Sequence, residues 1–273
     1  MSVHLYRVDC LTNMHVGSGD VNFGIIDQLV ERDVVTGEPV INASGVKGAL
    51  KEHCENKVIA GKNLDANTAH FIFGWVETVA NKKITHPGNY KFLSASLIAR
   101  PLRVSAGSRS HILVTTPYLT NTMIDTLAGF GIRAFDDARI TIELNDHEFK
   151  YHAKESALGI EGCPAAKMTN ENCALQALIC RDYAVTNDLS IYDLPVVARN
   201  QLDDNGISNN LWYEEIVPHK SVFYFIIITP GYDTCLCELE KYITGDGNVV
   251  QFGGNATVGC GFTKITKAAE FNG

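Results

Sequence analysis

The sequence has no long hydrophobic run, and its longest strongly apolar stretch, Val222 to Ile228, is too short to cross a bilayer. Because that stretch is rich in aromatic and β-branched residues, it predicts a buried strand. The first residues, Met1 to Asp9, lack the apolar core of a secretory signal. We therefore expect a cytoplasmic protein that does not enter a membrane.

The eight cysteines lack the paired C-x-x-C spacing of a zinc site, and a disulfide framework belongs to much smaller secreted chains. We expect all eight to be reduced and mostly buried. Nucleotide-binding signatures are absent as well. No G-x-x-x-x-G-K-[ST] loop exists, and the glycines at Gly17, Gly19 and Gly24 do not fit the dinucleotide fingerprint.

An excess of basic residues is also lacking, since the formal net charge is -8. Proteins that bind nucleic acids normally neutralise phosphates with a basic face, so this charge argues against such a function. A local groove of backbone N–H groups and a few lysines can still bind RNA, particularly when other subunits contribute charge. The 45% hydrophobic and 20% charged content is that of an ordinary globular protein.

The most informative stretch that is present runs from Ala43 to Glu52, where a turn of small residues opens into an amphipathic helix. Ser44 is a suitable N-cap, and Gly45 lets another backbone come close. Lys47 and Lys51 lie one turn apart, beside the unpaired N–H groups of the first helical turn. The pattern predicts an anion site, although a helix packed tightly on a sheet is the more common meaning of such a motif.

The rest of the chain predicts an α+β fold with a ferredoxin-like or RRM-like core, because strands and helices follow in the order strand, helix, strand, strand, helix. The RRM's aromatic RNP1 motif is missing, so bases are not expected to stack on the sheet. The predicted strands are Val3–Thr12, Gln28–Val35, Phe92–Val104, Ile112–Tyr118, Val222–Thr229 and Gly259–Ile265. The predicted helices run from Ser44 to about Val58, over Thr68–Trp75, from Thr120 or Asn121 to Gly129, and over Asp233–Ile243, with Asn81–Tyr90 as a loop and a hairpin near Asn145.

Four separated segments occur in a fixed order that is more specific than any one of them. They are H-V-G-S-G at 15–19 with Asp27, P-V-I-N-A-S-G-V-K-G-A-L-K at 39–51, L-P-V-V-A-R with L-W-Y-E-E-I-V-P between 194 and 218, and F-G-G-N-A-T-V-G-C-G-F at 252–262. Together they resemble the RAMP superfamily, and most closely the backbone subunit of type III-B CRISPR (Cmr) effector complexes. Lys51 stands where the family usually has arginine, which keeps the charge but loses the bidentate fork.

The resemblance implies a single RAMP domain over residues 1–273. Insertions are expected at about 60–90 and about 145–190, and a projecting thumb hairpin at about 194–217. It further implies that copies of the chain stack along a guide RNA, together with other Cmr-type subunits. Each thumb would flip one nucleotide out of the duplex of guide and target RNA, and the target would be cut at these regular intervals.

The resemblance places the cut at Asp27, in the loop after the H-V-G-S-G turn. A carboxylate that titrates well below neutral pH is a poor general base, so we expect Asp27 to hold a divalent metal, Mg²⁺, or to position the reacting groups. His15 is a second catalytic candidate, as a general base or a phosphate contact. A hydrogen-bonded structural histidine is an equally good reading of it.

Eight further residues are expected to contact RNA, either through backbone N–H groups of the glycine turns or through cationic side chains. They are Ser44, Gly45, Lys47, Lys51, Arg199, Gly253, Gly254 and Asn255. Glu214 and Glu215 are expected on a solvated face, without a catalytic role. Two other functions stay open from the sequence: a guide-RNA scaffold of the same fold that does not cut, and an enzyme that binds the phosphate groups of a small molecule.

Overall fold

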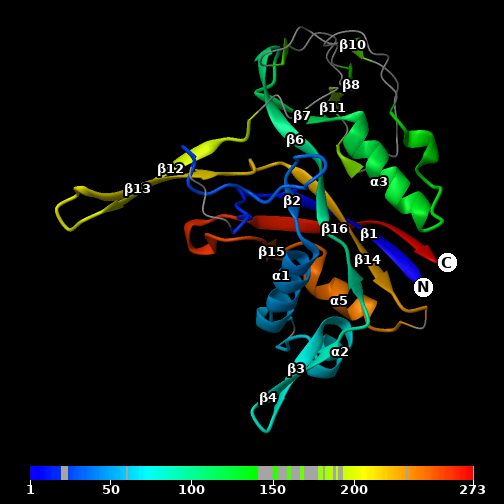
Figure 1. The fold of residues 1–273 in the computed structure, drawn as a ribbon. Helices are drawn as coiled ribbons and strands as arrows, with labels where there is room; N and C mark the ends of the chain where they lie inside the picture. Colours follow the sequence, from blue (N-terminus) through cyan, green and yellow to red (C-terminus); the bar gives the residue numbers. More distant parts are fainter. Residues whose placement is uncertain are drawn as a thin grey trace.

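Four long antiparallel strands form the centre of the molecule, in the spatial order β6, β14, β1 and β16 (Figure 1). They are β1 (Ser2–Cys10), β6 (Ala95–Ala106), β14 (Val222–Thr229) and β16 (Phe262–Asn272). The computed structural model describes residues 1–19, 24–59, 61–140, 150–152, 159–160, 167–168, 178–180, 182–186, 189, 193–231 and 233–272.

Helices and shorter strands surround this centre. The helices are α1 (Ala43–Asn56), α2 (Ala66–Phe73), α3 (Pro117–Gly129) and α5 (Leu236–Ile243). The shorter strands of the same sheet are β2 (Val40–Ile41), β5 (Lys91–Phe92), β7 (His111–Thr115), β8 (Lys150–His152), β9 (Gly159–Ile160), β10 (Lys167–Met168), β11 (Tyr183–Val185) and β15 (Val249–Gln251). Two hairpins stand apart from it, β3 (Gly74–Val79) with β4 (Lys82–Pro87), and β12 (Val196–Leu202) with β13 (Ser208–Glu215).

The core has the connectivity of a ferredoxin-like domain. Along the chain it reads β1, α1, β6, β14, α5, β16, and across the sheet the strands lie in the order second, third, first, fourth. This arrangement confirms the predicted α+β, ferredoxin-like fold class. The expected antiparallel partner of β6 and the helix after it are present as β7 and α3, but they are not core elements. Strand β7 extends the sheet beyond β6, and β14 and α5 complete the core.

Both faces of the sheet are covered, which explains why β14 is an uninterrupted apolar run. Phe223, Phe225 and Ile227 face the core cluster that includes the apolar residues of α1 and α5. Tyr224 and Ile226 face a second cluster, which includes the stripe of α3. Figure 1 shows α1 and α5 on one side of the sheet and α3 on the other. A strand that is buried on both faces carries no polar alternation.

The hairpin β12–β13 projects from the body and lies within the range predicted for the thumb (Figure 1). It is inserted between the second and third core strands, β6 and β14. The hairpin β3–β4 projects from another part of the body, next to α2 (Figure 1), so the loop predicted at Asn81–Tyr90 was wrong. The residues of this hairpin are mostly exposed, and the two strands satisfy each other's backbone hydrogen bonds. Because neither strand has a buried face, the sequence shows no alternation from which the strands could be predicted.

Several predicted boundaries also moved. The strand predicted at Gln28–Val35 is not formed. This segment makes only isolated bridges, because single residues of it pair with different neighbouring segments. Helix α1 takes Asn42 as its N-cap instead of Ser44, and α3 takes Thr116, whose hydroxyl accepts the Leu119 N–H at 3.1 Å. Pro117 at the first helical position was the sequence signal for that earlier start.

The hairpin predicted near Asn145 and most of the insertion expected at about 145–190 lie outside the described residues. Six of the eight cysteines lie within them, and all six are free thiols; Cys10, Cys54 and Cys260 are buried. In the described ranges, every helix is too short or too polar to cross a bilayer.

Candidate functional site

Two turns that are distant in the sequence meet at the base of the thumb hairpin. The Gly254 N–H donates to the His15 carbonyl oxygen at 2.9 Å. Gly253 has φ +78°, and a Cβ atom there would overlap that same oxygen. Only glycine allows the two backbones to approach this closely. The predicted H-V-G-S-G and F-G-G-N segments therefore form one structural unit.

Glu214 lies at the centre of this unit, with 3% of its surface exposed. Its carboxylate accepts hydrogen bonds from Arg199 Nε at 3.1 Å, Trp212 Nε1 at 2.8 Å and Asn255 Nδ2 at 3.0 Å. Burial by itself would raise the pKa of Glu214, but the Trp212 and Arg199 donors and the Arg199 charge hold that pKa below its ordinary value. Glu214 ties the two thumb strands to the second glycine turn.

Glu215 is also buried, at 5% exposed, so the solvated face expected for both glutamates was wrong. Its carboxylate pairs with Arg32 and accepts the Val30 N–H at 3.1 Å. Buried carboxylates persist where charged and backbone donors satisfy them, as they do here. Glu215 thereby fixes the segment that leads away from Asp27.

His15 is 5% exposed, and its Nδ1 lies 2.7 Å from the carbonyl oxygen of Glu215. Because a carbonyl only accepts, Nδ1 carries the proton, and Nε2 has the lone pair in the neutral imidazole. Nε2 in turn lies beside Gly17, where a Cβ atom would be 3.1 Å away. This packing favours the structural reading of His15 over that of a base in contact with substrate.

Asp27 is exposed and is held by the backbone of the thumb. Its Oδ2 accepts the Tyr213 N–H at 2.7 Å, and its own N–H donates to the Tyr213 carbonyl at 3.1 Å. Gln28 forms a parallel bridge with Glu214. Among the described residues, Oδ1 of Asp27 has no hydrogen-bond partner. The carboxylate thus combines a fixed position with access to a ligand.

Residues 7–264 match the family model of the RAMP superfamily. The chain belongs to the RAMP superfamily. This RAMP chain is 27% identical to the CRISPR system Cmr endoribonuclease Cmr4 of Pyrococcus furiosus, over 97% of this chain and 96% of that protein.

The RAMP chain is also similar in fold to solved structures. One belongs to a type III-B Cmr-beta complex bound to cognate target RNA, with a TM-score of 0.76 and 21% identity over 97% of both chains. Another is the crystal structure of oligomeric Cmr4 from Pyrococcus furiosus, with a TM-score of 0.67 and 20% identity over all of both chains. At these identities the likeness establishes the fold.

The predicted catalytic and RNA-binding residues of the RAMP chain form two groups in the structure. Asp27, His15, Arg199 and the turn of Gly253, Gly254 and Asn255 are linked through Glu214, Glu215 and Tyr213. The second group, at the start of α1, has no hydrogen bond or ion pair to the first among the described residues. It comprises Ser44, Gly45, Lys47 and Lys51. The assignments of both groups to catalysis or RNA binding stay predictions.

Within the second group the two lysines differ. Lys51 lies 3.8 Å from Glu55, whereas Lys47 has no ion-pair partner in the part of the chain that the structure describes. The N–H of Ala43 is already bonded to the Ser94 hydroxyl at 3.1 Å. The N–H groups of Ser44 and Gly45 follow it in the first helical turn, where backbone donors have no intrahelical partner. Lys47 and these two groups are therefore the ones available to an anion.

The donor set of the RAMP site fits a metal only in part. No group of three or more acidic, histidine or cysteine side chains that could hold an ion occurs among the described residues. Asp27 offers one exposed carboxylate, which suits Mg²⁺ when substrate phosphates and waters supply the other ligands. The described residues by themselves therefore do not form a closed metal cage.

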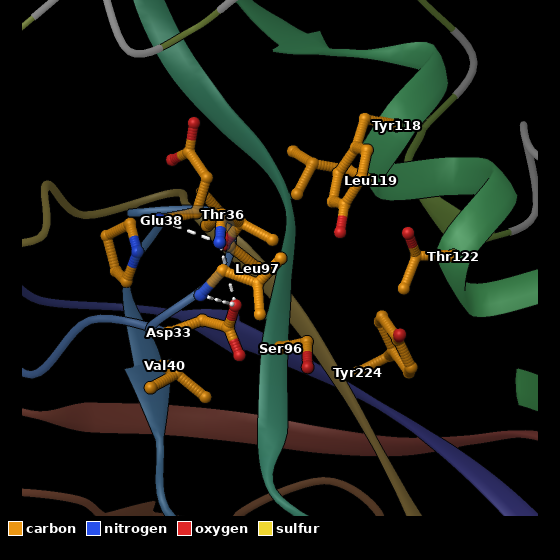
Figure 2. A pocket seen from close by; sticks show the side chains of 12 residues that line it. Asp33, Thr36, Glu38, Val40, Ser96, Leu97, Tyr118, Leu119, Thr122 and Tyr224 are labelled. Carbon is orange, nitrogen blue, oxygen red and sulfur yellow. Dashed lines mark hydrogen bonds between the residues drawn. The ribbon is translucent and has the colours of Figure 1, made fainter.

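A nearby acidic cavity is not a second site. A cavity of about 200 Å³ lies between the 33–40 segment, β6 and α3. In Figure 2, Asp33 and Glu38 lie on one side of it and Tyr118 on the other. Asp33 Oδ1 accepts the Val35 and Thr36 N–H groups at 3.0 and 2.9 Å. These bonds are those of a local turn and explain the carboxylate without a ligand.

Proposed function

We propose that this chain is the backbone subunit of a type III-B CRISPR ribonucleoprotein in the cytoplasm. In this function, copies of the chain assemble along a guide RNA together with other Cmr-type subunits. The complex cleaves complementary target RNA at regular intervals. The relationship to a Cmr endoribonuclease over nearly the full length of both chains supports this function, and so does the fold shared with a Cmr complex bound to target RNA.

The observation that carries the proposal is the position of Asp27. The side chain is exposed, yet both its backbone and one carboxylate oxygen are bonded to Tyr213 at the root of the projecting hairpin. A strand of RNA that bends around the hairpin passes this root. Fixed, solvent-accessible carboxylates at such a place suit a reaction that depends on positioning.

The chemistry assigned to Asp27 is cleavage at a kinked phosphodiester. The ribose 2′-oxygen bonds to the adjacent phosphorus and releases its proton to water, while the P–O5′ bond breaks and the 5′-oxygen takes up a proton from water. The reaction requires the 2′-oxygen in line with the P–O5′ bond and stabilisation of the developing charge. Asp27 holds Oδ1 toward the reacting groups while Tyr213 fixes Oδ2. A Mg²⁺ ion, if held by Asp27, would supply charge stabilisation to the phosphate. His15 acts from behind, by holding the main chain of Glu215 and thereby the root of the hairpin.

The guide strand is assigned to the start of α1 and to the second glycine turn. Lys47 and the N–H groups of Ser44 and Gly45 bind phosphates, and the turn formed by Gly253, Gly254 and Asn255 offers a second backbone surface. Because these are contacts to the backbone of the RNA, they accept any guide sequence. The negative net charge of the chain is compatible with this arrangement, since the contacts are local.

The test is Asp27→Asn in a complex reconstituted with guide RNA. The amide oxygen of the substituted side chain still accepts the Tyr213 N–H, so assembly and target binding are expected to stay within about twofold of wild type. Cleavage of target RNA is expected to fall by about 100-fold or more, the scale at which a positioned catalytic group contributes. Asp33→Asn is the matched control, because Asp33 is also exposed and also accepts backbone N–H groups.

Two outcomes separate the alternatives. If Asp27→Asn and Asp33→Asn cleave as fast as wild type, catalysis belongs to another residue and the chain is a guide-RNA scaffold. If the purified chain shows no salt-sensitive binding of RNA at all, the RNA function is refuted and a small-molecule enzyme becomes the better description.

A further inference from the structure

A second cavity opens at the root of the thumb hairpin and is not part of the site described above. Its volume is about 630 Å³, within the range of sites for small ligands. Four segments form its walls: β6, the start of β7, the residues that precede β12, and the residues that follow β13. Both legs of the thumb therefore leave the body of the protein beside this groove.

The charge of the groove is opposite to that of the whole chain. Arg100, Arg103 and Lys220 line it, together with one acidic residue, Asp193. The chain as a whole carries a net charge of -8, so positive side chains gathered in one cavity are a local departure. Positive side chains therefore outnumber the acidic one in this groove, which favours an anion there.

Lys220 is a cation of this groove that has no acidic partner among the described residues. Its ammonium lies 3.1 Å from Nε2 of His111, and since an ammonium has no acceptor, the imidazole must accept. Burial, and next the charge of Lys220, lower the pKa of His111. Across the described ranges no carboxylate pairs with Lys220. The ammonium is thus paired with a neutral ring and is available to an anion.

The backbone of Lys220 is also held in a conformation that costs free energy. Its φ is +72°, in the left-handed region that non-glycine residues avoid. A hydrogen bond from its N–H to the Cys10 carbonyl at 2.6 Å keeps it there. Backbone strain of this kind gathers at functional sites, where it fixes the direction of a side chain.

Arg100 supplies a buried cation to the same wall. It is 3% exposed, and one guanidinium nitrogen donates to the Leu189 carbonyl at 2.5 Å. Burial lowers the pKa of Arg100, while the charges of Glu38, Asp193 and Glu215 act in the opposite direction.

We propose that this groove binds one nucleotide of an RNA strand, with its phosphate on Lys220 and Arg103 and its sugar or base against Pro195 and Pro218. The proposal rests on the proposed function, because it adds an RNA contact next to the thumb. Prolines beside cations suit a ligand with flat apolar faces and a phosphate. A protein segment with acidic side chains would use the charges but not these apolar walls.

The test is Lys220→Gly in the full-length chain, with binding measured for a mixed-sequence single-stranded RNA of about eight nucleotides. Glycine removes the ammonium and tolerates the positive φ, so the melting temperature is expected to equal or exceed that of wild type. Affinity is expected to fall threefold to tenfold at about 0.1 M salt. The slope of log K against log salt concentration is expected to fall by about 0.7, the value for one lost phosphate contact on a single strand.

Lys83→Ala, on the exposed hairpin β3–β4, removes one lysine charge outside the groove and is expected to bind RNA as wild type does. Lys47→Ala is measured in parallel. If Lys47→Ala weakens binding and Lys220→Gly does not, the groove proposal is overturned while the proposed function stands. If neither variant changes RNA binding, the groove proposal and the assignment of Lys47 are both overturned, and a chain that binds no RNA at all also overturns the proposed function. Loss of self-association without RNA, at unchanged RNA affinity, would assign the groove to an acidic protein segment and also overturn the proposal.

Discussion

Replacing Glu214 with alanine removes the acceptor for three donors at once. Arg199, Trp212 and Asn255 lose their shared partner, and the Arg199 charge is left beside an apolar gap. Breaking a buried ion pair from one side costs about 3–5 kcal/mol. Because the Arg199 side chain is 25% exposed, water can solvate its charge and reduce this cost. We therefore expect the free energy of unfolding to fall by about 2–4 kcal/mol.

The assay is thermal and urea unfolding of the purified chain. A loss of this size lowers the melting temperature by about 4–15 °C in a protein of this length. Glu55→Ala is the control, since Glu55 is exposed and its pair with Lys51 spans 3.8 Å. We expect the control to change stability by less than about 0.5 kcal/mol. Equal effects of the two substitutions would refute the central role of Glu214.

The pH dependence gives an independent check of the same reasoning. The folded protein holds the pKa of Glu214 below its ordinary value of 4.5, so the charged carboxylate stabilises the fold. That contribution is complete above the unfolded pKa and is lost as the pH falls through the folded pKa. The stability difference between wild type and Glu214→Gln is therefore expected to be constant from pH 7 to about pH 5 and to shrink below the ordinary glutamate pKa. A difference that grows on acidification would contradict the lowered pKa.

Three further outcomes are expected. Gly253→Ala places a methyl group against the His15 carbonyl, at a residue whose φ is +78°, and is expected to lower the free energy of unfolding by about 1–3 kcal/mol. In Gly254→Ala the methyl group enters open space, so the same melting assay is expected to show no change. Lys47→Ala is expected to weaken guide-RNA binding more than Lys51→Ala, in a filter-binding titration, because Lys51 already faces a carboxylate; the reverse order would contradict this assignment. Chelation by EDTA is expected to stop target cleavage while guide RNA stays bound, and cleavage at full rate without divalent ions would exclude the metal.

The elements that the sequence predicted well are those whose pattern is local. The apolar run of β14, the alternation of β1 and the stripe of α3 were all predicted within a few residues, because each reports burial directly. The pairing partners could not be predicted in the same way. The strand at His111–Thr115 has the sequence of a core strand, yet it pairs with the far end of β6 and with the short strand β11, outside the four core strands.

In the candidate site, too, features with a local sequence pattern were predicted and long-range contacts were not. Asp27 was placed by its motif, and its exposure is consistent with that placement. Glu214 and Glu215 were assigned to solvent because adjacent carboxylates usually are solvated. Their partners, Arg199 and Arg32, lie 15 and 183 residues away along the chain, so no local pattern shows the pairs. Such long-range polar contacts become visible only once the fold brings the turns together.

Strand β1 lies between β14 and β16, with Ser2 opposite both Thr229 and Asn272. During synthesis the first strand must therefore wait for the last part of the chain before either of its edges is paired. Contacts of such long sequence separation slow folding and leave an unpaired edge exposed on the nascent protein. Residues 2–10 are therefore the part of the nascent chain that stays longest without its strand partners and is most open to wrong pairing.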